Sequence, residues 1–236
     1  MVVNIVMLVK DRPKLTEQSI QTLYRNTSKE LYNLTLVDDE SYKEYGQIYA
    51  ASGSNTVVLR IDNSKGITGQ ARNLGVYWAE KYWGRGDWLY LSDNDVYFTP
   101  GWLERLVKTF EAYDEDGFKL FGGWNHPFLQ PTYCGKNINF NIASHDAITG
   151  ASQLMRWSTW DKYGPLDSHA IGVSMGEDWK FCQDIIKDGG RVGSIYPRVV
   201  FNCGITNSFG QPAAGQDLMM KELLEAKMKY RDLYWE

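Results

Sequence analysis

The sequence of 236 residues lacks the marks of membrane, disulfide-stabilised and zinc-binding proteins. No apolar run reaches the roughly 18 residues that a membrane-spanning helix needs, so no such helix is expected. The segment Met1–Val9 lacks the basic start and the small-residue cleavage site of a signal peptide, and it is expected to form a strand. The three cysteines (Cys134, Cys182 and Cys203) are an odd number without metal-type spacing, which favours free thiols in a reducing compartment. We therefore predict a cytoplasmic protein, in the host cytoplasm if the source is viral.

Strong excess charge, internal repeats and linkers are missing as well. The net charge of −4 argues weakly against nucleic acid as a bulk electrostatic partner, while a local basic groove stays open. Neither a Walker A loop nor a dinucleotide-binding fingerprint is present. The hydrophobic content of 43% is enough for a sizeable core, and the length fits one large α/β domain or two small ones. In the absence of a linker, we predict a single domain.

The sequence does contain an alternation of apolar runs and amphipathic segments. Val2–Val9, Leu31–Val37 and Thr56–Ile61 are typical of strands that are buried on both faces. A helix is expected between the first two strands, from Pro13 to about Asn26. This order predicts an α/β fold with a mostly parallel, Rossmann-like sheet flanked by helices, and a ligand crevice at the carboxyl ends of the strands.

Further helices are expected along the chain, and the segment Gly122–Thr149 is expected to be irregular. The helices lie at four places: after a Thr68 cap with Leu74, Trp78 and Tyr82 facing inward, after a Thr99 cap with Pro100 in the first position, at Asp178–Lys187, and at the C-terminus within 216–236.

Polar side chains follow the ends of three predicted strands. Asp93 and Asp95 follow the apolar run Trp88–Leu91, and residues i and i+2 of an extended backbone point the same way. Two carboxylates aimed at one point suit Mg²⁺ or Mn²⁺ and, through the ion, a diphosphate. Taken alone, the pair is equally compatible with a polar turn. Lys10–Arg12 and Asp38–Asp39 end the first two strands, and three such clusters on one sheet edge favour a ligand site.

Two helix starts carry the remaining charged candidates. A glycine-containing lead with Lys65 and Arg72 opens one helix, and a helix N-terminus beside cationic side chains is suited to an anion. An ordinary loop-to-helix join would also explain the glycines. Glu177 and Asp178 open a later helix, where either can act as a base or simply stabilise the helix start.

The order of these motifs resembles family 2-like glycosyltransferases of the GT-A fold. The motifs are, in order, Lys10–Pro13, Asp38–Ser41, Gly66–Gly75, Asp93–Asp95 with Thr99–Leu103, Gly150–Ala151 and Gly176–Gly189. The resemblance covers roughly residues 2 to 205 and rests on the order of the motifs, not on any one of them.

The resemblance implies a nucleotide-sugar donor bound by the first half of the chain. Residues after the first strand and an aspartate after the second would hold the base and ribose, with Asp38 the better match and Asp39 the next. The donor-binding residues that it implies are Asp11, Arg12, Asp38, Asp39, Lys65, Arg72, Asn73 and Asp93.

The resemblance also implies a metal site and a general base. Asp93 and Asp95 would hold Mn²⁺ or Mg²⁺ against the diphosphate, and Glu177 or Asp178 would activate the acceptor hydroxyl. Many such enzymes have a histidine after the final core strand, where this sequence has Asn202 or Cys203. A thiolate suits these hard ions poorly, whereas an amide oxygen suits them, so Asn202 is the candidate third ligand.

The predicted function is the metal-dependent, inverting transfer of a sugar, from a UDP-sugar before other donors, to an acceptor hydroxyl. Within one domain, residues 1–121 would bind the nucleotide-sugar, residues 122–215 would bind the acceptor and carry the base, and residues 216–236 would form a C-terminal helix. The aromatic residues Trp124 and Tyr133 are candidates for the acceptor wall. The acceptor stays open between a glycan, a lipid-linked sugar, a protein, a small molecule and a hydroxymethylated base of viral DNA.

Two other functions are weighed against this one. A nucleotidyltransferase uses a similar sheet and metal, but Lys10–Pro13 lacks the glycine-rich loop after the first strand that such enzymes share. A non-catalytic sugar-nucleotide-binding module would not need both Asp93 with Asp95 and Glu177 with Asp178.

Overall fold

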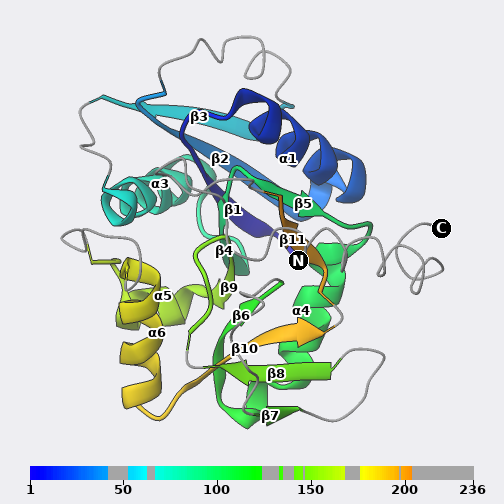
Figure 1. Cartoon of the computed structure of the whole chain (residues 1–236), viewed down its shortest axis with the longest axis vertical. Coiled ribbons are helices and arrows are strands. Elements are labelled where there is room, and N and C mark those ends of the chain that lie inside the picture. The colour runs from blue at the N-terminus through cyan, green and yellow to red at the C-terminus, as the bar shows by residue number, and fades with distance from the viewer. Residues whose placement is uncertain are drawn as a thin grey trace.

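A nine-stranded sheet runs through the molecule in the order β3-β2-β1-β4-β9-β6-β10-β8-β7 (Figure 1). The computed structural model describes residues 1–41, 53–62, 67–123, 133–134, 141–145, 147–167, 176–196 and 198–203. The strands are β1 (Val3–Val9), β2 (Tyr32–Asp39), β3 (Thr56–Ile61), β4 (Trp88–Asp93), β5 (Val96–Phe98), β6 (Phe118–Gly122), β7 (Tyr133–Cys134), β8 (Asn141–His145), β9 (Ser152–Arg156), β10 (Arg191–Tyr196) and β11 (Val200–Asn202). The helices are α1 (Pro13–Asn26), α3 (Thr68–Trp83), α4 (Trp102–Ala112), α5 (Trp157–Tyr163) and α6 (Glu177–Lys187), with 3-10 turns at Lys29–Leu31 and Asp114–Asp116.

Parallel pairing in the first half brings three strand ends to one edge. β1 lies between β2 and β4 and runs parallel to both, with Val9 opposite Asp38 and Leu8 opposite Asp93. β3 continues the parallel arrangement on the far side of β2. Every residue of β1 is buried, as expected for a central strand that is covered by helices on both faces. The predicted α/β fold with a mostly parallel sheet is therefore confirmed.

The second half completes the same sheet with mixed pairing. β9 lies antiparallel between β4 and β6, β10 is parallel to β6, and β8 is antiparallel to both β10 and β7. β5 and β11 form a separate antiparallel ribbon. The expectation that Gly122–Thr149 is irregular is wrong in part, because Tyr133–Cys134 and Asn141–His145 are strands.

The two faces of the sheet bury two separate cores, because successive residues of a strand point to opposite faces. The odd-numbered residues of β1, from Val3 to Val9, pack in the core that also holds the inner faces of α1 and α4. Val6 and Leu8 pack in the other core, with α3, α5 and α6. Figure 1 accordingly has α1 and α4 on one side of the sheet and α3, α5 and α6 on the other.

Helix α3 approaches the sheet closely. A Cβ atom on Gly75 would lie 2.6 Å from the Cγ2 atom of Val37 and 2.6 Å from the Cγ1 atom of Val6. The prediction that Trp78 and Tyr82 face inward is wrong, since they are 44% and 64% exposed. The buried residues of α3 are instead Gly69, Ala71, Arg72, Gly75, Val76 and Ala79.

Replacing Gly75 with alanine should destabilise the protein by about 1 kcal/mol. Alanine favours the helix by roughly 0.8 to 1 kcal/mol over glycine, but an extra methyl in a filled core costs about 1 to 3 kcal/mol. Urea unfolding would measure the change, with the exposed Lys81→Ala on the same helix as a control. A Gly75→Ala variant that is more stable than the wild type would show that the side chains of the sheet can shift to make room for the added methyl group.

The starts of two helices differ from the predictions. Thr68 is the first residue of α3, and Ile67 takes the cap position. Gly101 precedes α4 in the cap position with a left-handed φ of 65°, so neither Thr99 nor Pro100 opens that helix. The hydroxyl of Thr99 instead donates to the carbonyl of Val199 at 2.8 Å, because Val199, which directly precedes β11, lies beside Thr99.

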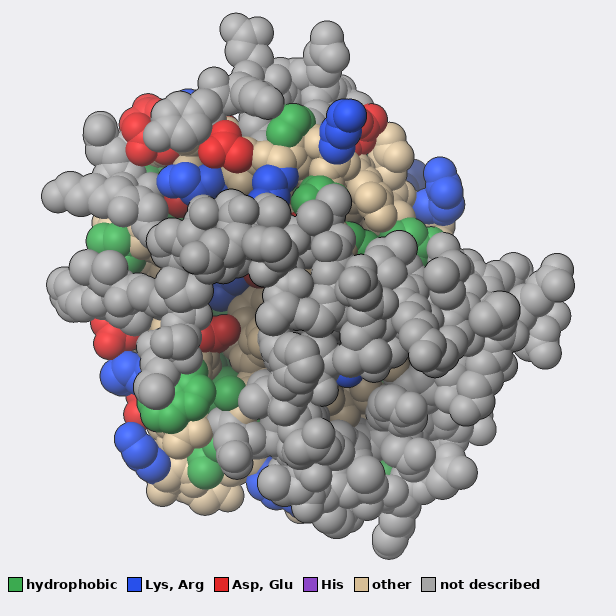
Figure 2. Space-filling model, in the orientation of Figure 1, with side chains coloured by type: hydrophobic (Ala, Val, Ile, Leu, Met, Phe, Trp, Pro, Cys, Tyr) green, Lys and Arg blue, Asp and Glu red, His purple; other side chains and the backbone are tan. Residues whose placement is uncertain are grey.

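Acidic and basic side chains are interspersed on the described part of the face drawn in Figure 2. This mixture agrees with the small net charge of −4. None of the helices in the described ranges is long and apolar enough to cross a membrane. The predicted C-terminal helix within 216–236 lies outside the described residues.

Candidate active site

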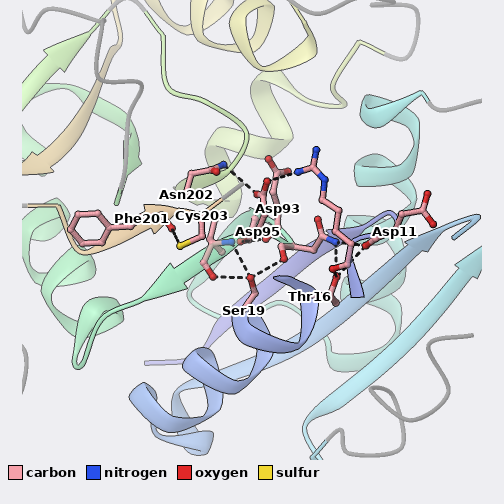
Figure 3. Close-up of polar contacts among 12 residues, drawn as sticks. Asp11, Thr16, Ser19, Asp93, Asp95, Phe201, Asn202 and Cys203 are labelled. Atoms are coloured by element: carbon pink, nitrogen blue, oxygen red, sulfur yellow. Dashed lines mark hydrogen bonds and ion pairs between the residues drawn. The ribbon is translucent and has the colours of Figure 1, made fainter. Parts of the chain in front are cut away.

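Asp93 and Asp95 lie side by side at the carboxyl edge of the parallel strands, between the start of α1 and β11 (Figure 3). Asp95 is only 7% exposed. Its Oδ2 atom accepts a hydrogen bond from Nη1 of Arg12 at 2.7 Å, and its Oδ1 atom accepts one from Nδ2 of Asn202 at 3.2 Å. Burial raises the pKa of Asp95 to about 6, and the charge of Asp93 adds to the rise while Arg12 opposes it. The two carboxylates therefore crowd negative charge into a place that favours a cation.

The turn that carries this pair is fixed by two polar residues of α1. The hydroxyl of Ser19 accepts the N–H of Val96 at 2.9 Å and lies 2.8 Å from the carbonyl of Asn94. The amide of Asn94 donates to the hydroxyl of Thr16 at 2.6 Å and to the carbonyl of Asp11 at 3.1 Å. Thr16 and Ser19 were not predicted, although two buried polar residues on the inner face of an amphipathic helix are a signal for such a role.

The ribbon of β5 and β11 holds the turn from the other side. Asn202 is paired with Val96, and the N–H of Cys203 donates to the main-chain carbonyl of Asp95 at 2.6 Å. The predicted metal residue Asn202 thus reaches Asp95 with its amide group. Its role as a ligand stays a prediction.

The two aspartates at the end of β2 have different surroundings. Both carboxylate oxygens of Asp38 already accept a hydrogen bond, Oδ2 from Nη1 of Arg60 at 2.7 Å and Oδ1 from the N–H of Ser41 at 3.0 Å. Asp39 is also buried, and its Oδ2 lies 3.3 Å from Nζ of Lys10. Within the part of the chain that the structure describes, the buried Oδ1 of Asp39 has no hydrogen-bond partner. Leaving a buried carboxylate oxygen without a donor is costly in free energy. Asp39 is therefore better placed than Asp38 to accept an N–H or O–H group of a ligand.

Arg72 of α3 joins two distant parts of the chain with one guanidinium group. Its Nη2 donates to Oδ1 of Asp93 at 2.5 Å, and its Nη1 donates to Oε1 of Glu177 at 3.0 Å. Arg72 is 3% exposed, and a Cβ atom on Gly150 would lie 1.9 Å from its Nη1. Burial lowers the pKa of Arg72, but the carboxylates of Asp93, Glu177 and Asp178 more than offset it, so the net shift is upward. The guanidinium is therefore a fixed cation between the two acidic pairs.

Glu177 and Asp178 begin α6 and face different partners. Glu177 is buried against Arg72, and burial raises its pKa although Arg72 opposes the rise. Asp178 is partly exposed. Its Oδ2 accepts the N–H of Gly150 at 2.9 Å, and its Oδ1 accepts the N–H of Trp179 at 2.8 Å. The missing side chain of Gly150 thus lets one loop contact both Arg72 and Asp178.

Some predicted residues are not brought into this cluster. The amide group of Asn73 exchanges two hydrogen bonds of 2.8 Å with the backbone of Leu166, so its nucleotide role stays a prediction. The side chain of Asp11 points away from Asp93 and Asp95 in Figure 3. Lys65 and Trp124 lie outside the described residues, and only the backbone of Tyr133 is described, in β7.

The donor set around Asp93 and Asp95 fits a hard divalent ion. No group of three or more His, Cys, Asp and Glu side chains that could hold a metal occurs within the described ranges. Two carboxylates and the Asn202 amide remain, which are the oxygen donors that Mg²⁺ and Mn²⁺ prefer. The burial of Asp95 beside the carboxylate of Asp93 supports the fit, because a divalent ion would neutralise the negative charge that is crowded there.

Comparison with known proteins points to one family. Residues 4–149 match the model of glycosyl transferase family 2. A search among curated proteins found no match.

Three solved structures illustrate the fold that this chain shares with known proteins. The mannosyltransferase PcManGT from Pyrobaculum calidifontis, in complex with GDP-Man and Mn²⁺, has a TM-score of 0.60 at 12% identity and covers 80% of this chain and 53% of its own. TarS 1–349 from S. aureus has a TM-score of 0.61 at 14% identity, and the match covers 85% of this chain and 59% of TarS 1–349. GalNAc-T7 with UDP, GalNAc and Mn²⁺ has a TM-score of 0.71 at 14% identity, and the match covers 97% of this chain and 48% of GalNAc-T7. The shared fold is the GT-A fold, and this chain spans about half the length of those proteins.

Proposed function

Because the chain belongs to glycosyl transferase family 2, we propose that it transfers a sugar from a nucleotide-sugar to an acceptor hydroxyl with the help of a divalent ion. The observation that carries this proposal is the Arg72 guanidinium, which bonds to Asp93 on one side and to Glu177 on the other. Residues suited to a metal–diphosphate and residues suited to proton transfer are thereby held within one cluster. A nucleotide-binding module without catalysis has no need of the second group.

The donor half of the site is assigned to Asp39, Asp93 and Asp95, with Asn202 as the third candidate metal ligand. A divalent ion bound there would neutralise the charge that develops on the departing diphosphate. The open Oδ1 of Asp39, beside the ammonium group of Lys10, matches a base edge that offers an N–H next to a carbonyl, as uracil and guanine do. This match supports a UDP-sugar or a GDP-sugar as the donor. Solved structures with this fold contain GDP-Man with Mn²⁺ in one case and UDP with Mn²⁺ in another, which supports a nucleotide–metal pair.

The general base is assigned to Asp178, with Glu177 as a positioning residue. Glu177 is buried and committed to Arg72, whereas Asp178 is partly exposed. Two main-chain N–H groups orient Asp178, and each of its oxygens keeps a second lone pair for a substrate proton. The acceptor oxygen attacks the anomeric carbon, the bond from that carbon to the diphosphate oxygen breaks, and the acceptor proton passes to Asp178. One displacement of this kind inverts the anomeric configuration.

The acceptor is proposed only as a hydroxyl-bearing molecule. The net charge of −4 and the mixture of charges on the described part of the face in Figure 2 lend no support to DNA as that molecule. The sequence prediction of a reducing, cytoplasmic compartment is consistent with this proposal and stays a prediction.

UDP together with Mn²⁺ should raise the melting temperature of the protein. At a hundredfold excess over Kd, the gain is about 2.7 kcal/mol, which corresponds to about 5 to 10 °C for a chain of this size. Asp95→Asn keeps the shape of the side chain but removes its charge, so the Mn²⁺-dependent part of the rise should vanish. Differential scanning fluorimetry with a panel of UDP- and GDP-sugars would measure this. If no nucleotide-sugar stabilises the wild type, the donor site is wrongly assigned. Where a nucleotide-sugar does stabilise it, Mn²⁺-dependent hydrolysis of that nucleotide-sugar would distinguish an enzyme from a binding module.

A further inference from the structure

Arg12 sits in a strained stretch of backbone directly in front of α1. Asp11 and Arg12 both adopt left-handed φ angles, of 49° and 57°, which residues other than glycine rarely take. Strain of this kind costs of order 1 to 3 kcal/mol per residue and is typical of functional sites. Here it accompanies an ion pair in which Nη1 of Arg12 lies 2.7 Å from Oδ2 of Asp95.

That ion pair involves an oxygen that a metal ion would need. The Oδ2 atom of Asp95 accepts from Arg12, and its Oδ1 atom accepts from the amide of Asn202. Asn202 is neutral, and rotation of its amide would exchange the N–H₂ group for the carbonyl oxygen. Arg12 is always charged and carries only donors, so it competes with a divalent cation for Oδ2 of Asp95 and is repelled by a cation bound there.

The two arginines of the site differ in how freely they can leave their carboxylates. The side chain of Arg72 is 4% exposed and is bonded to both Asp93 and Glu177. The side chain of Arg12 is 25% exposed and lies at the rim, on the connection between β1 and α1. The guanidinium of Arg12 therefore lies closer to solvent than that of Arg72, which is buried between two carboxylates.

We propose that Arg12 is an exchangeable counter-ion, which neutralises Asp95 before the donor binds and moves to the diphosphate when the metal ion takes Asp95. The proposal rests on the donor site described above and assigns Arg12 to the diphosphate instead of to the base and ribose. A guanidinium group matches phosphate oxygens in the same forked geometry as a carboxylate, so the charge-assisted bonds lost at Asp95 are replaced. The crevice keeps its charge balance in both states.

The exchange makes metal and nucleotide bind cooperatively. Mn²⁺ alone has to break the Arg12–Asp95 pair, whereas UDP gives Arg12 a new partner and leaves Asp95 open. By linkage, the factor by which UDP strengthens Mn²⁺ binding equals the factor by which Mn²⁺ strengthens UDP binding. Part of that factor comes from direct contact between the ion and the diphosphate, and the rest is assigned to Arg12.

Titration calorimetry with Mn²⁺ alone, and with UDP in the presence and absence of Mn²⁺, tests the exchange in Arg12→Gln. This variant should bind Mn²⁺ alone about tenfold more tightly than the wild type and bind UDP with Mn²⁺ about tenfold more weakly, within the usual range of coupling between sites. Lys10→Gln removes the same charge two residues away, beside Asp39 instead of Asp95, and serves as the control for Mn²⁺ alone. Arg12→Lys keeps the charge without the fork and should lie between the wild type and Arg12→Gln. Melting curves would establish that each variant is folded.

Equal Mn²⁺ affinities in Arg12→Gln and Lys10→Gln would overturn the counter-ion role. The increase in Mn²⁺ affinity would then follow from the loss of any nearby positive charge. Unchanged UDP affinity in Arg12→Gln would overturn the transfer to the diphosphate. If the wild-type protein binds no UDP even with Mn²⁺, the donor-site assignment itself is wrong. The counter-ion role is tested separately, by the binding of Mn²⁺ alone.

Discussion

Replacing Asp178 with asparagine should lower kcat by about 10² to 10⁴-fold, the usual contribution of a positioned base, and leave the affinity for UDP and Mn²⁺ unchanged. An amide has no basic oxygen that can take the proton of the acceptor hydroxyl. The donor site is spared because Asp178 bonds to the N–H groups of Gly150 and Trp179 and not to Arg72. Single-turnover rates with a saturating donor, together with calorimetric UDP binding, would measure both quantities.

Glu177→Gln is the matched control for this prediction, because it makes the same chemical change one residue earlier. Glu177 accepts from Arg72, which also holds Asp93, so its loss should weaken Mn²⁺ and UDP binding as well as turnover. The reverse pattern, with normal turnover in Asp178→Asn and a pure kcat loss in Glu177→Gln, would move the base to Glu177. Normal turnover in both variants would remove the base from this pair of residues.

The parallel half of the fold was predictable because its signals are local. Val3–Val9 is a continuous apolar run, and such a run is stable as a strand only when both of its faces are covered. Once β1, β2 and β4 are parallel neighbours, the carboxylates at the ends of β2 and β4 must share an edge with the residues after β1. The approximate location of Asp39, Asp93 and Asp95 therefore follows from strand ends alone, without knowledge of any side-chain contact.

The contacts inside the site were not predictable because they join residues that lie far apart in the chain. Arg72 reaches Asp93 across 21 positions and Glu177 across 105 positions. Nothing local to Asn202 indicates that the β5–β11 ribbon will bring it to Asp95. Likewise, the apolar stripe through Trp78 and Tyr82 matched the helical period but is exposed, because the sheet and α6 cover a neighbouring stripe of α3 that carries Arg72, Val76 and Ala79.

Strand β9 (Ser152–Arg156) was missed for a related reason. Its sequence, Ser-Gln-Leu-Met-Arg, contains no β-branched or aromatic residue. It forms a strand because its backbone fills the gap between β4 and β6, to both of which it is antiparallel. That strand places Gly150, just before it, against Arg72 and Asp178. Part of the site thus depends on a strand that tertiary pairing specifies and propensity does not.

Replacing Arg72 with methionine should destabilise the protein by about 3 to 5 kcal/mol at pH 8, the usual cost of removing one partner from a buried ion pair. Methionine fills a similar volume but leaves Asp93 and Glu177 without their shared counter-ion. Burial already raises the pKa of Glu177 in the presence of Arg72, and the loss of Arg72 should raise it further. A carboxylate with a raised pKa in the folded state binds more protons there than in the unfolded state, so its contribution to stability falls as the pH rises. The deficit relative to the wild type should therefore be smaller at pH 5 than at pH 8.

Urea unfolding at both pH values would measure this deficit, and a second substitution tests its cause. In Arg72→Met/Glu177→Gln the buried carboxylate is gone as well, and the side chain of Asp93 is 34% exposed and can be hydrated. The double variant should therefore be more stable than Arg72→Met at pH 8 and lose most of the pH dependence. A double variant less stable than Arg72→Met would mean that the cost comes from lost packing around the guanidinium, at Gly150 among other places, and not from an uncompensated charge. Recovery of stability in the double variant would instead establish Arg72 as the cation on which the burial of Glu177, and with it the start of α6, depends.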